Sequence, residues 1–66
     1  MKTKIINLKK TILKDVDFIT RTYPNTEDIL YQINMILDNN MDDDKIDEWF
    51  ISNKYTIDII NEILER

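Results

Sequence analysis

The sequence contains no glycine, no cysteine and no histidine, and only one proline among its 66 residues. Without cysteine or histidine, the chain has no thiol nucleophile, no imidazole base and none of the common zinc ligand sets. Without glycine, it lacks the phosphate-binding loops of the familiar nucleotide-binding motifs. We therefore expect a protein that is not an enzyme and that has no catalytic residues, no cofactor and no metal site.

The length is that of a single small domain, residues 1–66, whose core supplies roughly 3–5 kcal/mol of net stability. Hydrophobic residues make up 42% of the chain and charged residues 33%, a balance that predicts a folded protein rather than a disordered one. No apolar run is long enough to span a bilayer, and the basic N-terminus lacks the apolar region of a signal peptide. We expect an intracellular, cytoplasmic protein that does not bind membranes.

Charge is divided unevenly along the chain. Residues 1–23 carry six basic and two acidic side chains, whereas residues 24–66 carry three basic and eleven acidic ones, for a net charge of −4. Such a division can steer association with a basic partner, or it can pair the first helix with the rest of the fold.

The spacing of apolar residues at intervals of three and four predicts an all-α fold, a small compact bundle of about four short helices. Pro24 ends the first helix, and either Asn25 or Thr26 is expected to cap the second. Asp38-Asn39-Asn40 is expected to end the second helix, with asparagine in the left-handed turn that glycine usually provides, and Thr56 is expected to cap the last helix. The predicted helices cover about 3–22, 26–38, 43–53 and 56 to the chain end, and residues 1–7 are either helical or an extended arm. Short connections predict two helical hairpins.

Each predicted helix has one apolar stripe. Trp49 and Phe50 are expected to pack near Ile33, Ile36 and Ile60 in the core. Phe18 instead falls on the polar side of a continuous first helix, so that either this helix is covered on two sides or Phe18 is exposed. The stripes comprise Ile5, Leu8, Ile12, Val16, Ile19 and Tyr23; Ile29, Leu30, Ile33, Ile36 and Leu37; Ile46, Trp49 and Phe50; and Ile57, Ile59, Ile60, Ile63 and Leu64.

Two stretches of the chain share a pattern. The residues from Phe18 to Ile33 align with those from Phe50 to Ile63 if Pro24-Asn25 is an insertion, and both read as a helix end, an aromatic residue, a threonine cap and a new helix. The pattern indicates a repeated helix-turn-helix plan, and it leaves open whether the gene was duplicated or the similarity arose by chance.

Two motifs were tested and rejected. Asp38, Asn40 and Asp42 match three positions of an EF-hand calcium loop, but Asp43 stands where glycine is required and Trp49 where a bidentate glutamate is required. A DNA-binding helix-turn-helix over the last two helices is the less favoured reading, because carboxylates at 58, 62 and 65 would be repelled by phosphate. We therefore do not expect nucleic acid as a partner.

Two partial resemblances involve the same region. Tyr23-Pro24, followed by a helix and then by the residues 46–50, resembles the CUE ubiquitin-binding domain, with Tyr-Pro in place of Met-Phe-Pro and Trp-Phe in place of the paired leucines. The residues 46–49 through 59–60 are similar to the helix pair that opens DnaD-type replication domains, without a distinctive motif. The resemblance to the CUE domain fails at the residues that bind ubiquitin in that family, and neither resemblance identifies a family for this chain.

The acidic run that begins the third helix is the strongest candidate for a binding site. Five carboxylates within seven residues exceed the number that a helix start needs, and only Lys45 offsets them in the sequence. We expect a small acidic protein-protein interaction module that binds a basic protein surface, with apolar contacts added by Tyr31, Met35 or Ile51. The carboxylates are Asp42, Asp43, Asp44, Asp47 and Glu48.

Size, acidity and a composition typical of AT-rich genomes resemble those of phage or mobile-element proteins that inhibit or regulate a host protein. In that case the site of action is the cytoplasm of the host cell. The alternative is a structural or regulatory subunit that forms a homodimer or larger homo-oligomer.

Overall fold

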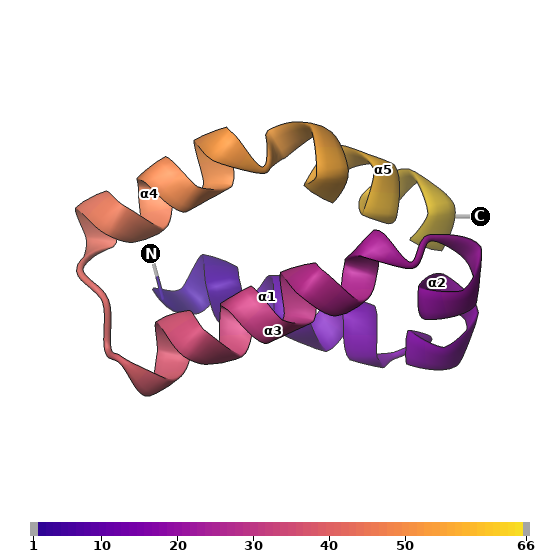
Figure 1. Cartoon of the computed structure of the whole chain (residues 1–66), viewed down its shortest axis with the longest axis horizontal. Helices are drawn as coiled ribbons and strands as arrows, with labels where there is room; N and C mark the ends of the chain where they lie inside the picture. Colours follow the sequence, from indigo (N-terminus) through magenta and orange to yellow (C-terminus); the bar gives the residue numbers. More distant parts are fainter. Residues whose placement is uncertain (1, 66) are drawn as a thin grey trace.

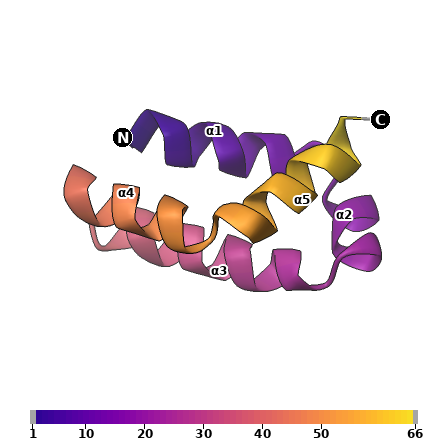
Figure 2. The ribbon, with the colours of Figure 1, turned by 90° about the horizontal axis from the view of Figure 1, so that it is seen from above.

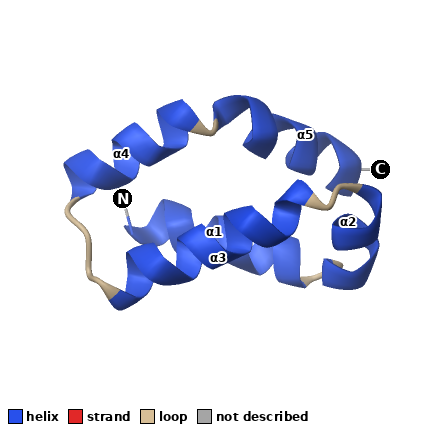
Figure 3. Cartoon of the chain, viewed as in Figure 1, coloured by secondary structure: helices blue, strands red, loops and turns tan. Residues whose placement is uncertain are grey.

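The computed structural model describes residues 2–65, and in this range the chain forms five α-helices and no strand (Figures 1 and 3). The helices are α1 (Lys2–Leu13), α2 (Val16–Thr22), α3 (Asn25–Asp38), α4 (Asp43–Ser52) and α5 (Lys54–Leu64). The all-α prediction is confirmed, with five short helices in place of about four. Each helix within this range is too short or too polar to cross a membrane.

The chain passes three times along the long axis of the molecule. The first pass is α1, the second is α3, which returns beside it, and the third consists of α4 and α5 in succession; α2 lies across one end (Figures 1 and 2). The first and second passes form the expected antiparallel pair. The expected second hairpin is not formed, because α4 and α5 are joined by Asn53 alone and continue in the same general direction. One residue is too short a connection to reverse the chain.

The predicted first helix is divided into α1 and α2. Asp15 has φ −142° and ψ 44°, outside the helical region, and its N–H donates to the Ile12 carbonyl oxygen at 3.2 Å. The residue types favour an interruption here, because an aspartate competes for backbone hydrogen bonds and Val16 is β-branched. The break lets α2 pack against α3 and α5, so that Ile19 is fully buried and Phe18 is half-buried. Phe18 is thus not exposed, and the alternative of a helix covered on more than one side holds for α2, which packs against both α3 and α5.

The start of the chain is helical. Because α1 begins at Lys2, residues 2–7 continue the helix, and the alternative of an extended arm is wrong for them; Met1 lies outside the described residues. The predicted helix over 26–38 is confirmed to within one residue at its start.

Two of the predicted caps differ from the structure. Pro24, with φ −57° and ψ −26°, is the residue before α3, and Thr26 lies inside the first turn with its side chain fully buried. Thr56 lies within the first turn of α5, whose preceding residue is Asn53. The Asn53 side chain is directed backward, and its Nδ2 donates to the Trp49 carbonyl oxygen at 2.9 Å. Asn53 therefore ends α4, as predicted, and begins α5 as well.

The end of α3 is confirmed as a left-handed turn made by asparagine. Asn40 has φ 51°. Its N–H donates to the Leu37 carbonyl oxygen at 3.3 Å, and the N–H of Met41 donates to the Ile36 carbonyl oxygen at 3.3 Å. These two bonds define a Schellman motif. Met41 also packs against the core, which supplies the apolar contact that accompanies this motif.

The core is built almost entirely from isoleucine, with contributions from all five helices. Most predicted stripe positions are buried or packed against buried residues, and Trp49 and Phe50 belong to the second group because they are half-buried and pack against the core. The buried hydrophobic residues are Ile5, Leu8, Ile12, Ile19, Ile29, Ile33, Ile36, Ile46, Ile57 and Ile60.

Trp49 and Phe50 join α4 to the helices on its two flanks. The indole Nε1 of Trp49 donates to Gln32 Oε1 of α3 at 2.7 Å, and Lys4 Nζ of α1 lies 4.5 Å from the centroid of the Phe50 ring. The two rings meet edge to face, with centroids 5.2 Å apart and an interplanar angle of 81°. Their half-buried positions follow from this arrangement, since each ring lies at a seam between helices.

The two stretches that align in sequence have different environments. Ile19 is fully buried, whereas its counterpart Ile51 is 76% exposed. Tyr23 packs against the core, whereas Tyr55 is 79% exposed. The alignment therefore does not correspond to a repeated packing unit.

Candidate functional site

The acidic run lies at the start of α4. Asp42 precedes the helix with extended backbone angles, φ −69° and ψ 159°, while Asp43 and Asp44 lie in the first turn. Asp47 and Glu48 follow in the second turn. All are exposed except Asp47, which is half-buried.

Spacings of three and four residues place Asp44, Asp47, Glu48 and Ile51 on one side of α4, here termed the outer face. Asp44 is close enough to the helix start to be stabilised by the helix dipole, whereas Glu48 lies beyond the first turn. Within residues 2–65, Lys54 Nζ pairs with Asp58 Oδ2 at 2.8 Å, and none of Asp44, Asp47 and Glu48 forms an ion pair with another described residue. On the outer face, Asp47 and Glu48 thus lie beyond the first turn and have no ion pair among the described residues.

The three apolar residues expected to add contact area are exposed: Tyr31 is 67% accessible, Met35 45% and Ile51 76%. They do not form one patch. Trp49 is directed toward α3, and Ile51, two residues further on, is rotated by about 200° around α4. Ile51 therefore lies on the side of α4 away from α3, which carries Tyr31 and Met35.

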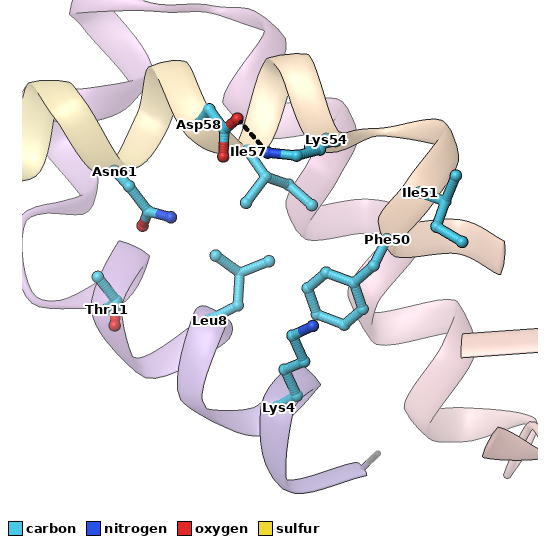
Figure 4. A pocket seen from close by; sticks show the side chains of 9 residues that line it. All are labelled: Lys4, Leu8, Thr11, Phe50, Ile51, Lys54, Ile57, Asp58 and Asn61. Carbon is cyan, nitrogen blue, oxygen red and sulfur yellow. Dashed lines mark hydrogen bonds and ion pairs between the residues drawn. The ribbon is translucent and has the colours of Figure 1, made fainter. Parts of the chain in front are cut away.

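A groove lies between α1 on one side and α4 and α5 on the other (Figure 4). Its volume is about 440 Å³. Leu8 and Ile57 form the apolar floor, and the Phe50 ring closes one end next to Lys4. The lining comprises Lys4, Leu8, Thr11, Phe50, Ile51, Lys54, Ile57, Asp58 and Asn61.

The groove was not predicted from the sequence, because its residues come from three helices and meet only when the helices pack. One signal was available: Ile51 falls outside the core stripe of its helix, and an exposed isoleucine beside a core aromatic marks the rim of such a groove. A concave site with an apolar floor and a few polar groups is the usual form of a binding site.

Neither rejected motif gains support from the geometry. Among residues 2–65 no three acidic side chains are grouped so that they could hold a metal ion. The segment tested as a calcium loop is instead the Schellman motif at Asn40 followed by the start of α4. A helix-turn-helix needs a turn of three or four residues, whereas Asn53 alone joins α4 to α5.

The basic side chains within the predicted first helix, 3–22, do not form one helix face in the structure. Lys9 and Lys10 belong to α1, Lys14 lies in the turn after it, and Arg21 belongs to α2. Arg21 Nε donates to the Asp17 carbonyl oxygen at 3.1 Å. The break at Asp15 thus separates Arg21 from the lysines.

No protein-family model matches the chain, and no curated protein or solved structure is significantly similar to it. Its function is therefore inferred from the outer face of α4 and from the groove. The outer face carries carboxylates, and the groove has an apolar floor with a few polar groups around it.

Proposed function

We propose that the protein is a protein-protein interaction module that binds a basic surface of a partner protein through the outer face of α4. Three carboxylates on this face, Asp44, Asp47 and Glu48, have no counter-ion among residues 2–65. Like charges at spacings of three and four destabilise a helix by a few tenths of a kcal/mol per pair. The repulsion among these carboxylates destabilises the helix, and no counter-ion among residues 2–65 offsets it. This is the observation that supports binding.

The charged face determines the association rate and the choice of partner, whereas apolar contact slows dissociation. Ile51 provides such contact at the end of the outer face, and Asp42 and Asp43 extend its negative potential toward the start of α4. Tyr31 and Met35 lie on α3, so a partner reaches them only if it also covers that helix.

The proposal of a host factor as the partner rests on an analogy of composition and size. The small acidic chain, rich in isoleucine, asparagine and lysine, resembles phage or mobile-element proteins that inhibit or regulate a host factor. On this proposal the protein acts by binding and not by catalysis, in the cytoplasm of the host cell.

Affinity capture from the source cell, followed by mass spectrometry, tests this proposal. The bait is the whole chain, compared with a variant in which Asp44→Asn, Asp47→Asn and Glu48→Gln remove the charges and keep the shapes of the side chains. A partner retained by the native bait and lost with this variant supports the proposal. Glu62→Gln, an exposed change on α5, is the matched control and should retain the partner. Equal capture by all three baits would exclude the outer face.

A further inference from the structure

We propose that the groove between α1 and α4–α5 binds a small amphipathic carboxylate, that is, an apolar molecule with one carboxylate group at its end. The groove has a volume of about 440 Å³ and an apolar floor made by Leu8 and Ile57. Sites for small ligands usually have roughly 300–1,000 Å³ of mainly apolar space with a few polar groups. This inference is independent of the proposed function, because the groove and the outer face of α4 share only Ile51.

The charges in the lining leave one cation uncompensated. The charged residues of the lining are Lys4, Lys54 and Asp58. Lys54 Nζ and Asp58 Oδ2 pair with each other at 2.8 Å, so that their charges compensate (Figure 4). Lys4 forms no ion pair with another residue in the range 2–65. A ligand with one negative charge therefore complements the charge of the groove.

The ammonium group of Lys4 lies at one end of the apolar floor. Its Nζ is 4.5 Å from the centroid of the Phe50 ring, which closes this end of the groove. The face of a ring attracts a cation without neutralising its charge, so this ammonium group can still pair with a carboxylate. Lys4 also belongs to the first turn of α1, which holds no acidic residue, and the positive end of the helix dipole adds to its potential.

The floor gives the ligand an apolar body. From Lys4 the groove follows α1 past Leu8 to Thr11, about 10 Å further along at a rise of about 1.5 Å per residue. Ile57 lies across from Leu8, and Asn61 lies with Thr11 at the far end (Figure 4). An aliphatic chain with its carboxylate at Lys4 therefore covers both apolar floor residues and ends near polar groups.

A small molecule fits this groove better than a peptide does. Side chains of three helices line it, and backbone groups inside a helix bond within that helix, so an extended peptide finds no row of free N–H and C=O groups. A single lysine also favours a carboxylate over a phosphate monoester. The monoester carries about −1.5 to −2 charges at neutral pH, and the excess would lie next to Asp58.

Octanoate and octanol test the inference on the whole chain, because they share an aliphatic chain and differ in charge. Titrations are followed by the backbone amide signals in NMR spectra. Octanoate should shift the signals of residues around the floor, Leu8 and Ile57, with a dissociation constant of about 1 mM, as expected for a ligand of this size. Lys4→Gln should raise this constant about 5-fold, the upper range for a partly exposed ion pair, and leave that of octanol unchanged.

Lys10→Gln is the matched control, because it removes the same charge from an exposed residue of α1 that does not line the groove. It should leave both dissociation constants unchanged. Ile51→Ala should weaken both probes, since it removes apolar surface from the groove edge. The NMR spectra also confirm that each variant is folded. Absence of localised shifts at about 10 mM octanoate would overturn the inference, as would equal weakening of octanoate by Lys4→Gln and Lys10→Gln.

Discussion

The indole Nε1 of Trp49 donates a hydrogen bond to Gln32 Oε1 at 2.7 Å, and this contact joins α4 to α3 across 17 positions of sequence. This hydrogen bond is partly buried, and it connects α4 to α3. The only tryptophan of the chain thus has both an apolar and a polar role, as is usual for this residue at a seam.

Trp49→Ala is expected to lower the free energy of unfolding by about 3 kcal/mol, since it removes a large packed ring and leaves Gln32 without its partner. Trp49→Phe keeps most of the ring and removes only the donor, so a loss of about 1 kcal/mol is expected. Urea unfolding followed by circular dichroism measures both. A cooperative Trp49→Ala variant as stable as the native chain would show that this side chain is not part of the packed structure.

The Schellman motif predicts the effect of substitutions at Asn40. Alanine there must adopt the left-handed conformation, and a loss of about 1 kcal/mol is expected. Asn40→Gly should be neutral or slightly stabilising, because glycine reaches φ 51° without strain. Asn34→Ala, at an exposed position inside α3, is the control, and helix propensity predicts no loss. If both alanine variants had the same melting temperature, the left-handed turn would not contribute to stability.

Apolar periodicity predicted the helical class and most of the core, because every helix of a small bundle must bury one stripe. Periodicity could not predict the break at Asp15, since Ile12 and Ile19 would both face the core in one continuous helix, and both are equally buried on the separate helices α1 and α2. The cap at Thr56 was misplaced because a threonine before an apolar run satisfies the capping pattern whether or not the helix has already begun. The groove depends on how α1 packs against α4 and α5, and single-helix patterns do not contain that information.

The buried hydroxyl of Thr26 predicts a substitution that stabilises the protein. Its side chain is fully buried, and Oγ1 has no hydrogen-bond partner among the described residues. Thr26→Val should therefore raise the free energy of unfolding by about 1 kcal/mol, equivalent to roughly 4–8 °C in melting temperature for a domain of this size. Thr20→Val is the matched control and should be destabilising, because Thr20 Oγ1 donates to the Val16 carbonyl oxygen at 2.7 Å. A destabilised Thr26→Val variant would mean that the hydroxyl is hydrogen-bonded in solution.

Metal independence is a separate prediction. The EF-hand pattern around Asp38 lacks both the glycine and the bidentate glutamate that calcium coordination requires. The melting temperature in 1 mM calcium or magnesium is therefore expected to lie within about 1 °C of that in chelator. An ion that does not bind the folded state cannot stabilise it against unfolding. A rise of several degrees at micromolar calcium would contradict the rejection of this loop.

The last prediction concerns the kinetics of binding to the captured partner. Glu48 is the best residue for this test, because it is exposed, lies beyond the first turn of α4 and has no ion pair within residues 2–65. Glu48→Lys changes the charge of the outer face by two units, and it should slow association several-fold at low salt while leaving the dissociation rate nearly unchanged. The dependence of the association rate on ionic strength should flatten at the same time, because screening has less attraction to remove.

Glu62→Lys is the control. It makes the same change of net charge on α5, away from the outer face, and should have a much smaller effect on the association rate. Equal slowing by the two variants would show that net charge, and not the outer face of α4, steers the encounter. The binding role would then pass to the apolar residues of α3 or to the basic side chains of the first predicted helix, and substitution of Tyr31 and Met35 would distinguish these two.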